Sequence, residues 1–215
     1  MAFAFNYNNL ITEISAQLNR NDAVFLAQCP VFITLAEQRI FVDFSQLGNE
    51  QYYTGNFVAG VGTLAKPPLW GKTLTFSYLD SNGNVVILER ISYEYARKYI
   101  NNPTAQNALT LPKYYTDKGY GLLLVVPTPQ IAFQFEWVFL AKATPLGLSV
   151  EQQTNWYTTY GYDLLLAACC YYASVYLDNV QQQAKWDKIY KERIELYNIY
   201  NKGRKADRNA DVLMD

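Results

Sequence analysis

Between residues 127 and 200 the sequence passes from an extended pattern to a helical one. Aromatic rings first recur at every second position, as in a strand with one buried face; they are Phe133, Phe135, Trp137 and Phe139. A long loop, 141–154, is followed by two helical patterns. The first, 162–177, is apolar on nearly every side, and the second, about 180–201, carries one apolar stripe. Because an apolar helix must be surrounded by other elements, these patterns predict a helical bundle with 162–177 near its centre.

The first fifty residues are also helical by pattern. Asn6 can cap a first helix, the polar run 19–22 can end it and cap a short second one, and Pro30 suits the first turn of a third. The inner stripe expected for that third helix is Phe32, Leu35, Ala36 and Ile40. Glu37 and Arg39 are expected to face elsewhere. The residues predicted for the interior of the whole bundle are Ile14, Ile40 and Leu165.

The middle of the chain has a pattern typical of short strands. Glycines and prolines between 51 and 71 exclude a long helix. The run 72–78 alternates, so Leu74, Phe76 and Tyr78 are predicted to share one face. Further patterns predict a turn at 80–84, a partner strand at 85–88, a short helix at 93–100 and strands at 121–126 and 130–140.

Together these patterns predict an α+β protein, in which N- and C-terminal helices form one bundle around a small inserted antiparallel β-module. The expected divisions are 1–50 for the N-terminal helices, 51–145 for the inserted β-module with its short helix, 146–202 for the C-terminal helices and 203–215 for a flexible tail. Gly203 is expected to stop the last helix.

Composition argues against chemistry as the function. The formal net charge of -1 gives no general attraction to nucleic acid or to an anionic membrane. The chain has no histidine, so Ser-His-Asp and Cys-His catalytic sets are excluded, and it has no phosphate-binding glycine motif. Its three cysteines are expected to be buried apolar residues in a reducing compartment; they are Cys29, Cys169 and Cys170. We therefore expect no enzymatic activity, no metal and no cofactor. The start of the chain lacks the pattern of a secretion signal, and we expect synthesis in the cytoplasm.

Two alternatives to a purely structural role remain at this point. Glu89 and Glu136 could act as paired carboxylates of a hydrolase if their strands are adjacent. Trp70, Trp156 and Tyr157 could stack on sugars or on a protein partner, although each could equally pack at a bundle end or a domain junction.

The C-terminal residues after the last helix combine basic and apolar side chains. The basic residues are Lys202, Arg204, Lys205 and Arg208, and the apolar ones are Val212, Leu213 and Met214. Such a segment is either a solvated terminus or a peptide that orders when it docks on a partner.

The order of these motifs resembles the head-to-tail connector adaptor proteins of tailed bacteriophages, especially short-tailed ones. In the first helices the resemblance is carried by Tyr7, Leu10, Ile11, Ile14, Leu18, Arg20, Asp22, Phe32-Ile33, Ala36-Glu37 and Arg39-Ile40. In the middle it is carried by 88–96, Pro112, Tyr114-Tyr115 and Pro127-Thr128-Pro129. In the last third it is carried by 135–145, Asn155-Trp156, Tyr160, Leu164-Leu165, Ala184, Trp186 and Tyr190.

The resemblance implies a structural protein of the virion neck, made in the host cytoplasm. Such a subunit belongs to a homo-oligomeric ring, usually of twelve copies, beneath the portal protein. The ring extends the DNA channel, lets DNA pass without specific binding, and offers a surface to tail hub or nozzle proteins. It needs no membrane. In this setting the tail that begins at Lys202 is expected to dock on the portal. The alternative function is a carbohydrate-binding tail component that uses exposed Trp and Tyr side chains.

Overall fold

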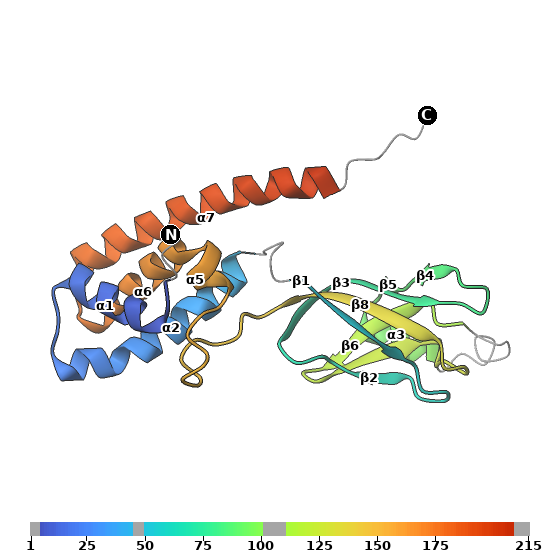
Figure 1. Ribbon diagram of the computed structural model, residues 1–215. Coiled ribbons are helices and arrows are strands. Elements are labelled where there is room, and N and C mark those ends of the chain that lie inside the picture. Colours follow the sequence, from blue (N-terminus) through green and yellow to red (C-terminus); the bar gives the residue numbers. More distant parts are fainter. Residues whose placement is uncertain (1–4, 45–49, 101–110, 209–215) are drawn as a thin grey trace. The chain divides into compact units, whose positions relative to one another are not determined.

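The computed structural model describes residues 5–44, 50–100 and 111–208, with the backbone alone from 201 onward, and it divides the chain into two compact units (Figure 1). The helical unit consists of Met1–Asn49 and Lys142–Asp215, and the β-module consists of Glu50–Ala141. Each unit has a hydrophobic core of its own. Helices from both ends of the chain with a β-module between them confirm the predicted α+β class.

The first two helices of the structure correct one prediction. Asn6 caps α1 (Tyr7–Leu18) as expected, but α2 runs without a break over Ala23–Asp43, and Pro30 lies inside it. A proline inside a helix removes one backbone hydrogen bond. Here buried residues precede and follow Pro30 on the same face of α2, among them Phe25 and Ile33, and their burial in one core holds the helix together.

The buried face of α2 also differs from its predicted face. Leu35 is 38% exposed, whereas Ile33 and Glu37 lie in the buried stripe. Glu37 is buried because an amide from another segment satisfies its carboxylate, which the sequence of α2 alone does not show. By length and composition α2 could span a bilayer, but its buried face belongs to the core of the helical unit.

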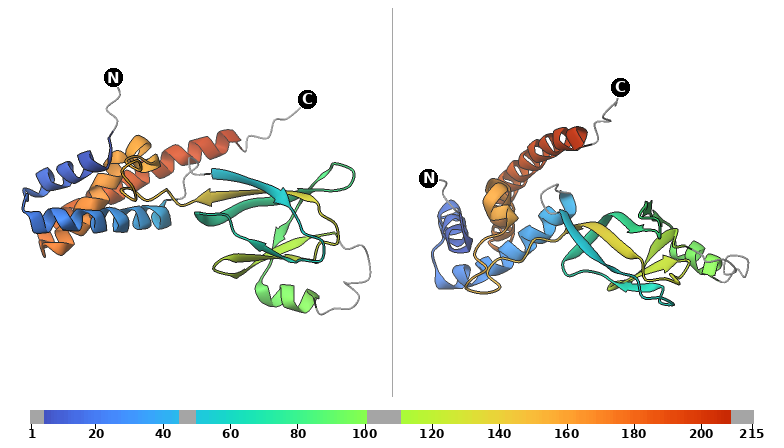
Figure 2. Two further views of the ribbon diagram at one scale, coloured as in Figure 1. Left: turned by 60° about the horizontal axis from the view of Figure 1, so that its bottom comes forward. Right: turned by 45° about the vertical axis from the view of Figure 1, so that its right-hand side comes forward.

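The C-terminal helices complete the bundle. They are α5 (Trp156–Tyr160), α6 (Tyr162–Tyr176) and α7 (Val180–Arg208). α6 packs against both α2 and α7 (Figure 2) and supplies the centre of the core, as predicted. Ile14, Ile40 and Leu165 are all fully buried, which confirms their predicted place.

The end of α7 is a second correction. The helix was predicted to end at about 201 with Gly203 as its stop, but it continues through Gly203 to Arg208. A glycine costs only about 1 kcal/mol in a helix interior, so it lowers the stability of a long helix without ending it.

The described residues of the β-module, 50–100 and 111–141, form two four-stranded sheets. Sheet A has the order β1-β8-β3-β4, made of Glu50–Asn56, Gln134–Ala141, Trp70–Leu79 and Val85–Ile87. Sheet B has the order β2-β7-β6-β5, made of Thr63–Ala65, Leu122–Val126, Tyr114–Gly119 and Glu89–Arg90. All neighbours are antiparallel except β5 and β6, which are parallel. The short helix α3 (Tyr93–Ile100) was predicted over the same residues; Ser92 caps it, and it packs on β6 and β7 (Figure 2).

An irregularity in β3 changes the predicted alternation. The register with β8 shifts between Thr73 and Thr75, so Leu74 is 40% exposed while Phe76 and Tyr78 are buried. An extra residue in one strand reverses the faces on either side of it. Thr73 therefore turns toward the indole of Trp137 and accepts a hydrogen bond from it.

Candidate functional site

A polar junction inside the helical unit joins α2 to the segment that begins α5. Asn155 caps α5, and its Oδ1 accepts hydrogen bonds from the backbone N–H groups of Tyr157 and Thr158. Its Nδ2 donates to Glu37 Oε1 at 2.6 Å and to the carbonyl oxygen of Thr144 at 3.0 Å. Four backbone or side-chain groups are thus held by one amide, which fixes the loop before α5 against α2.

The carboxyl group of Glu37 has a raised pKa because this junction buries it. Its side chain is in the interior, and burial raises its pKa to about 7, although hydrogen bonds from Asn155 and from the backbone of Leu146 favour the charged form. Tyr157 lies beside it; burial first, and then the charge of Glu37, raise the pKa of its hydroxyl. Glu37 is therefore partly protonated at neutral pH.

Replacing Glu37 with Gln should change how stability depends on pH. A carboxyl whose pKa rises from 4.5 to about 7 on folding stabilises the protein fully below pH 4.5, and that contribution is lost as the pH rises to about 7. Gln keeps an oxygen that accepts the Asn155 hydrogen bond but has no charge. From pH 5 to pH 8 the stability of E37Q should therefore fall less than that of the wild type, by an amount on the order of 3 kcal/mol. The loss of the hydrogen bond from Leu146, which the amide nitrogen of Gln cannot accept, lowers the stability of E37Q equally at both pH values. Urea unfolding at pH 5 and pH 8 measures this, with exposed Glu136→Gln as the control; equal pH profiles for wild type and E37Q would contradict it.

The first half of α7 is fixed to α2 by a second polar network. Arg39 Nη2 lies 2.8 Å from Asp187 Oδ1, and the guanidinium lies over the rings of Tyr171 and Tyr190 at 4.7 Å and 4.0 Å from their centroids. The hydroxyl of Tyr190 donates to Asp43 Oδ2 at 2.8 Å. The Arg39 side chain is only 19% exposed, so these contacts are largely shielded from water. These contacts hold α7 in place against α2.

The second half of α7 has a different surface. Tyr197 still bonds to the α5–α6 region, through the carbonyl oxygen of Tyr160 and the carboxylate of Asp163. On the same stretch Leu196, Ile199 and Tyr200 are more than half exposed. An exposed apolar surface on the second half of a long helix is typical of a contact with another protein.

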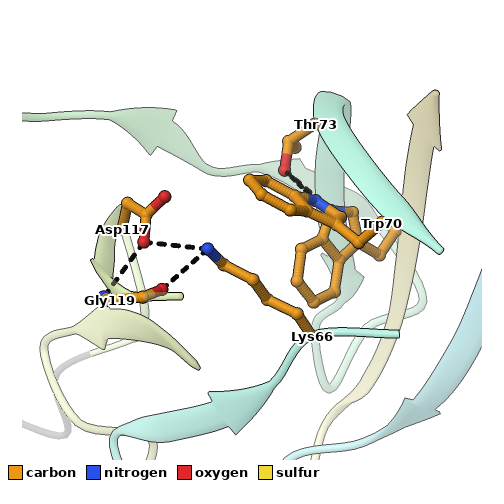
Figure 3. A network of polar contacts seen from close by, with 6 residues as sticks. Lys66, Trp70, Thr73, Asp117 and Gly119 are labelled. Carbon is orange, nitrogen blue, oxygen red and sulfur yellow. Dashed lines mark hydrogen bonds and ion pairs between the residues drawn. The ribbon is translucent and has the colours of Figure 1, made fainter. Parts of the chain in front are cut away.

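In the β-module a buried lysine joins the two sheets (Figure 3). Lys66 Nζ lies 2.9 Å from Asp117 Oδ1 and donates to the carbonyl oxygen of Gly119 at 2.8 Å. The same ammonium group lies 3.9 Å from the centroid of the Trp70 ring, and Trp70 Nε1 donates to Thr73. Burial alone would raise the pKa of Asp117, but the hydrogen bonds from Lys66 and Gly119 lower it below its usual range. The lysine side chain is 5% exposed and fully partnered, which suits a structural role.

The predicted aromatic residues lie in three different settings. The Trp70 ring already has Lys66 on its face. Trp156 is partly buried against the bundle core, with its ring 6.5 Å from that of Phe44. Tyr157 is 1% exposed, so of the two settings considered for it the structure shows packing inside the bundle. The reason is the Asn155 cap, which begins α5 in such a way that Tyr157 turns into the core.

The structure also separates the two carboxylates considered for hydrolysis. Glu89 lies on β5 of sheet B and Glu136 on β8 of sheet A, and the neighbours of β8 are β1 and β3. Their strands are not adjacent, so the condition for that hypothesis fails. Among the side chains that the structure describes, in 5–44, 50–100 and 111–200, no group of three that could hold a metal ion occurs. The three cysteines are unpaired and buried, as predicted.

The predicted docking tail is only partly described. Lys202, Arg204, Lys205 and Arg208 lie on the last turns of α7 instead of in a tail after it. Val212, Leu213 and Met214 lie outside the described residues.

Sequence reasoning missed an exposed apolar stripe on α2. It consists of Val24, Val31, Leu35 and Val42, which are between 38% and 79% exposed. Their spacing of seven, four and seven residues places them on one side of a helix. That spacing is visible in the sequence, but the assumed break at Pro30 concealed it. An apolar stripe of this length on an exposed helix is typical of a protein–protein contact.

A protein-family model described as SU10 adaptor protein matches residues 5–212. No curated protein sequence matches the chain.

Proposed function

Because this chain belongs to the SU10 adaptor protein family, a phage head-to-tail adaptor family, we propose that it is the ring subunit that connects the portal protein to the tail. The observation that carries this proposal is the family match, since it includes both the helical unit and the β-module. In the proposed ring, of twelve copies as in the adaptors that the chain resembles, the lumen extends the DNA channel. The near-neutral net charge suits a channel through which DNA slides without being held.

The contacts of the helical unit support a role in assembly. The networks around Glu37 and Arg39 make the bundle a fixed support, and they leave apolar surfaces on the outer side of α2 and on the end of α7. Apolar surface that is held in place by a rigid support loses little entropy on binding. The proposed partners of these surfaces are the portal and the tail hub or nozzle proteins.

A sugar-binding role is less well supported. Of the three aromatic residues considered for it, Tyr157 is buried and Trp70 is covered on one face by Lys66. A glycan array with the purified protein distinguishes the two functions, because an adaptor should show no preference for any sugar.

The location of the protein tests the proposal in the virion itself. A phage that lacks this chain should accumulate filled heads without tails, and antibody labelling of wild-type particles should mark the neck. Labelling of the tail tip or the capsid faces, or tailed particles without this chain, would show that the proposed function is wrong.

Two truncations test the proposed docking of the C-terminal segment on the portal. Removal of 209–215 takes away Val212, Leu213 and Met214 and leaves all of α7, whereas removal of 203–215 also takes away Arg204, Lys205 and Arg208. Both variants should keep the melting temperature of the full chain, because every core residue of the helical unit in the described part of the chain precedes 203. Both should bind the portal more weakly, the longer deletion by more, since apolar burial and charge complementarity are removed in turn.

Binding of each truncated chain to immobilised portal protein measures this effect at two salt concentrations. The basic residues should make binding of the full chain and of the shorter truncation weaken as salt rises. The longer truncation keeps only Lys202 of these residues and should lose most of that dependence. Wild-type affinity in both variants would exclude a docking role for the segment.

A further inference from the structure

The two edges of sheet A run in opposite directions. Its order is β1-β8-β3-β4, and each of the three neighbouring pairs is antiparallel. β1 and β3 therefore run one way, and β8 and β4 run the other way. A sheet of this kind can be continued by an identical sheet, because β4 of one copy would meet β1 of the next in the antiparallel sense that the sheet already has.

The β1 edge has few of the features that usually prevent strand pairing, since its one charged residue, Glu50, stands at its first position. Within the described residues β1 pairs only with β8, along its whole length from Glu50 to Asn56. The strand contains neither proline nor lysine, the residues that natural proteins place on edges to block pairing. Two of its tyrosines are exposed, Tyr52 by 63% and Tyr53 by 41%. This edge is therefore suited to accept another strand.

The side chains at the two edges are complementary. On β1 an added Cβ at Gly55 would lie 2.8 Å from the ring of buried Phe135, so odd-numbered positions face the core and Tyr52 faces outward. On β4 Val86 packs against the core, while Val85 and Ile87 are 65% and 64% exposed on the outer face. An aromatic ring opposite β-branched side chains is among the favourable cross-strand pairs.

We propose that sheet A continues from one subunit to the next, with β4 of one copy paired antiparallel to β1 of its neighbour and Tyr52 packed on Val85 and Ile87. The inference rests on the proposed ring and names the surface that joins its β-modules. The contact uses two different edges of each copy, which is the kind of interface that closes into a ring when its rotation divides a full turn. A strand from another protein on β1 would leave Val85 and Ile87 exposed, whereas a second copy covers both edges at once.

Paired cysteines test this contact in the assembled protein. Two variants carry Tyr52→Cys together with Val85→Cys or with Ile87→Cys, because either β4 residue can lie opposite Tyr52. The native cysteines are buried and react slowly under native conditions. Rings assembled on the portal are treated with a short bis-maleimide and run on a denaturing gel. At least one double variant should give a ladder of covalent multimers that extends to the full ring.

The first controls are the single cysteine variants. A further control combines Tyr52→Cys with Tyr93→Cys, which places the second thiol at an exposed residue of helix α3, on the side of sheet B. None of them should give a ladder. Rings on the portal without a ladder in either double variant would refute the continuous sheet and leave the proposed function intact. Covalent dimers alone would also refute it, since they indicate a two-fold contact. Absence of any ring on the portal would contradict the proposed function and this inference together.

Discussion

Replacing Leu165 with Asp should unfold the helical unit. The side chain is fully buried at the centre of the core on α6, among residues contributed by α1, α2 and α7. An unpaired carboxylate there loses its hydration without gaining a partner, which costs more than about 4 kcal/mol. A loss of that size is comparable to the whole free energy of unfolding of a typical domain, about 5–15 kcal/mol. Ile14→Asp, at an equally buried residue of α1, should have the same effect.

The matched control makes the same chemical change at an exposed leucine. Leu196 on α7 is 55% exposed, and Leu196→Asp should change the free energy of unfolding by less than about 0.5 kcal/mol. Far-UV circular dichroism during urea unfolding compares the three variants. If Leu165→Asp unfolds at the wild-type urea concentration, then the bundle does not have its core where the structure places it.

Replacing Trp137 with Ala should have the largest effect in the β-module. The indole is fully buried on β8, its centroid is 5.2 Å from that of Phe76, and its Nε1 donates to Thr73 Oγ1 at 2.9 Å. Removal of a buried tryptophan ring costs about 3–5 kcal/mol, since the ring contacts are lost and a cavity remains. Because the β-module has a core of its own, the loss of protection should be concentrated in 50–141.

Hydrogen exchange measured peptide by peptide tests both the size and the place of this effect. Tyr52→Ala, at an exposed ring on the same sheet, is the control and should leave exchange in the core strands unchanged. Equal loss of protection in the helical unit and the β-module would show that the two units unfold as one. An unchanged exchange pattern would show that Trp137 does not support the core.

The parts of the fold that the sequence predicts correctly depend on local signals, namely helix caps and the alternation of a strand. Asn6, Ser92 and the aromatic alternation around Trp137 each act within one element, so their neighbours in the sequence were enough to place them. The errors arose where a distant contact decided the outcome. Pro30 is tolerated inside α2 because the residues on both sides of it are buried in one core.

The same physical reason explains what was missed in the candidate site. A carboxylate such as Glu37 is ordinarily solvated, and its burial is made possible by hydrogen bonds from Asn155 and from the backbone of Leu146, both more than a hundred residues away. The shift in β3 at Leu74 depends on pairing with β8, and the pattern of β3 alone predicts regular alternation. For Tyr157 the sequence leaves both stacking on a partner and packing in the bundle open, because an aromatic residue near a loop does not reveal whether it faces the core.

An electron-microscopic reconstruction of this protein mixed with the portal of its own phage tests the central claim most directly. We expect a closed ring of this chain bound to one end of the portal, coaxial with its channel, with α7 directed at the portal and its end in contact with it. A portal that stays bare at saturating concentrations, or a complex in which this chain binds away from the channel axis, would show that the chain is not the adaptor ring.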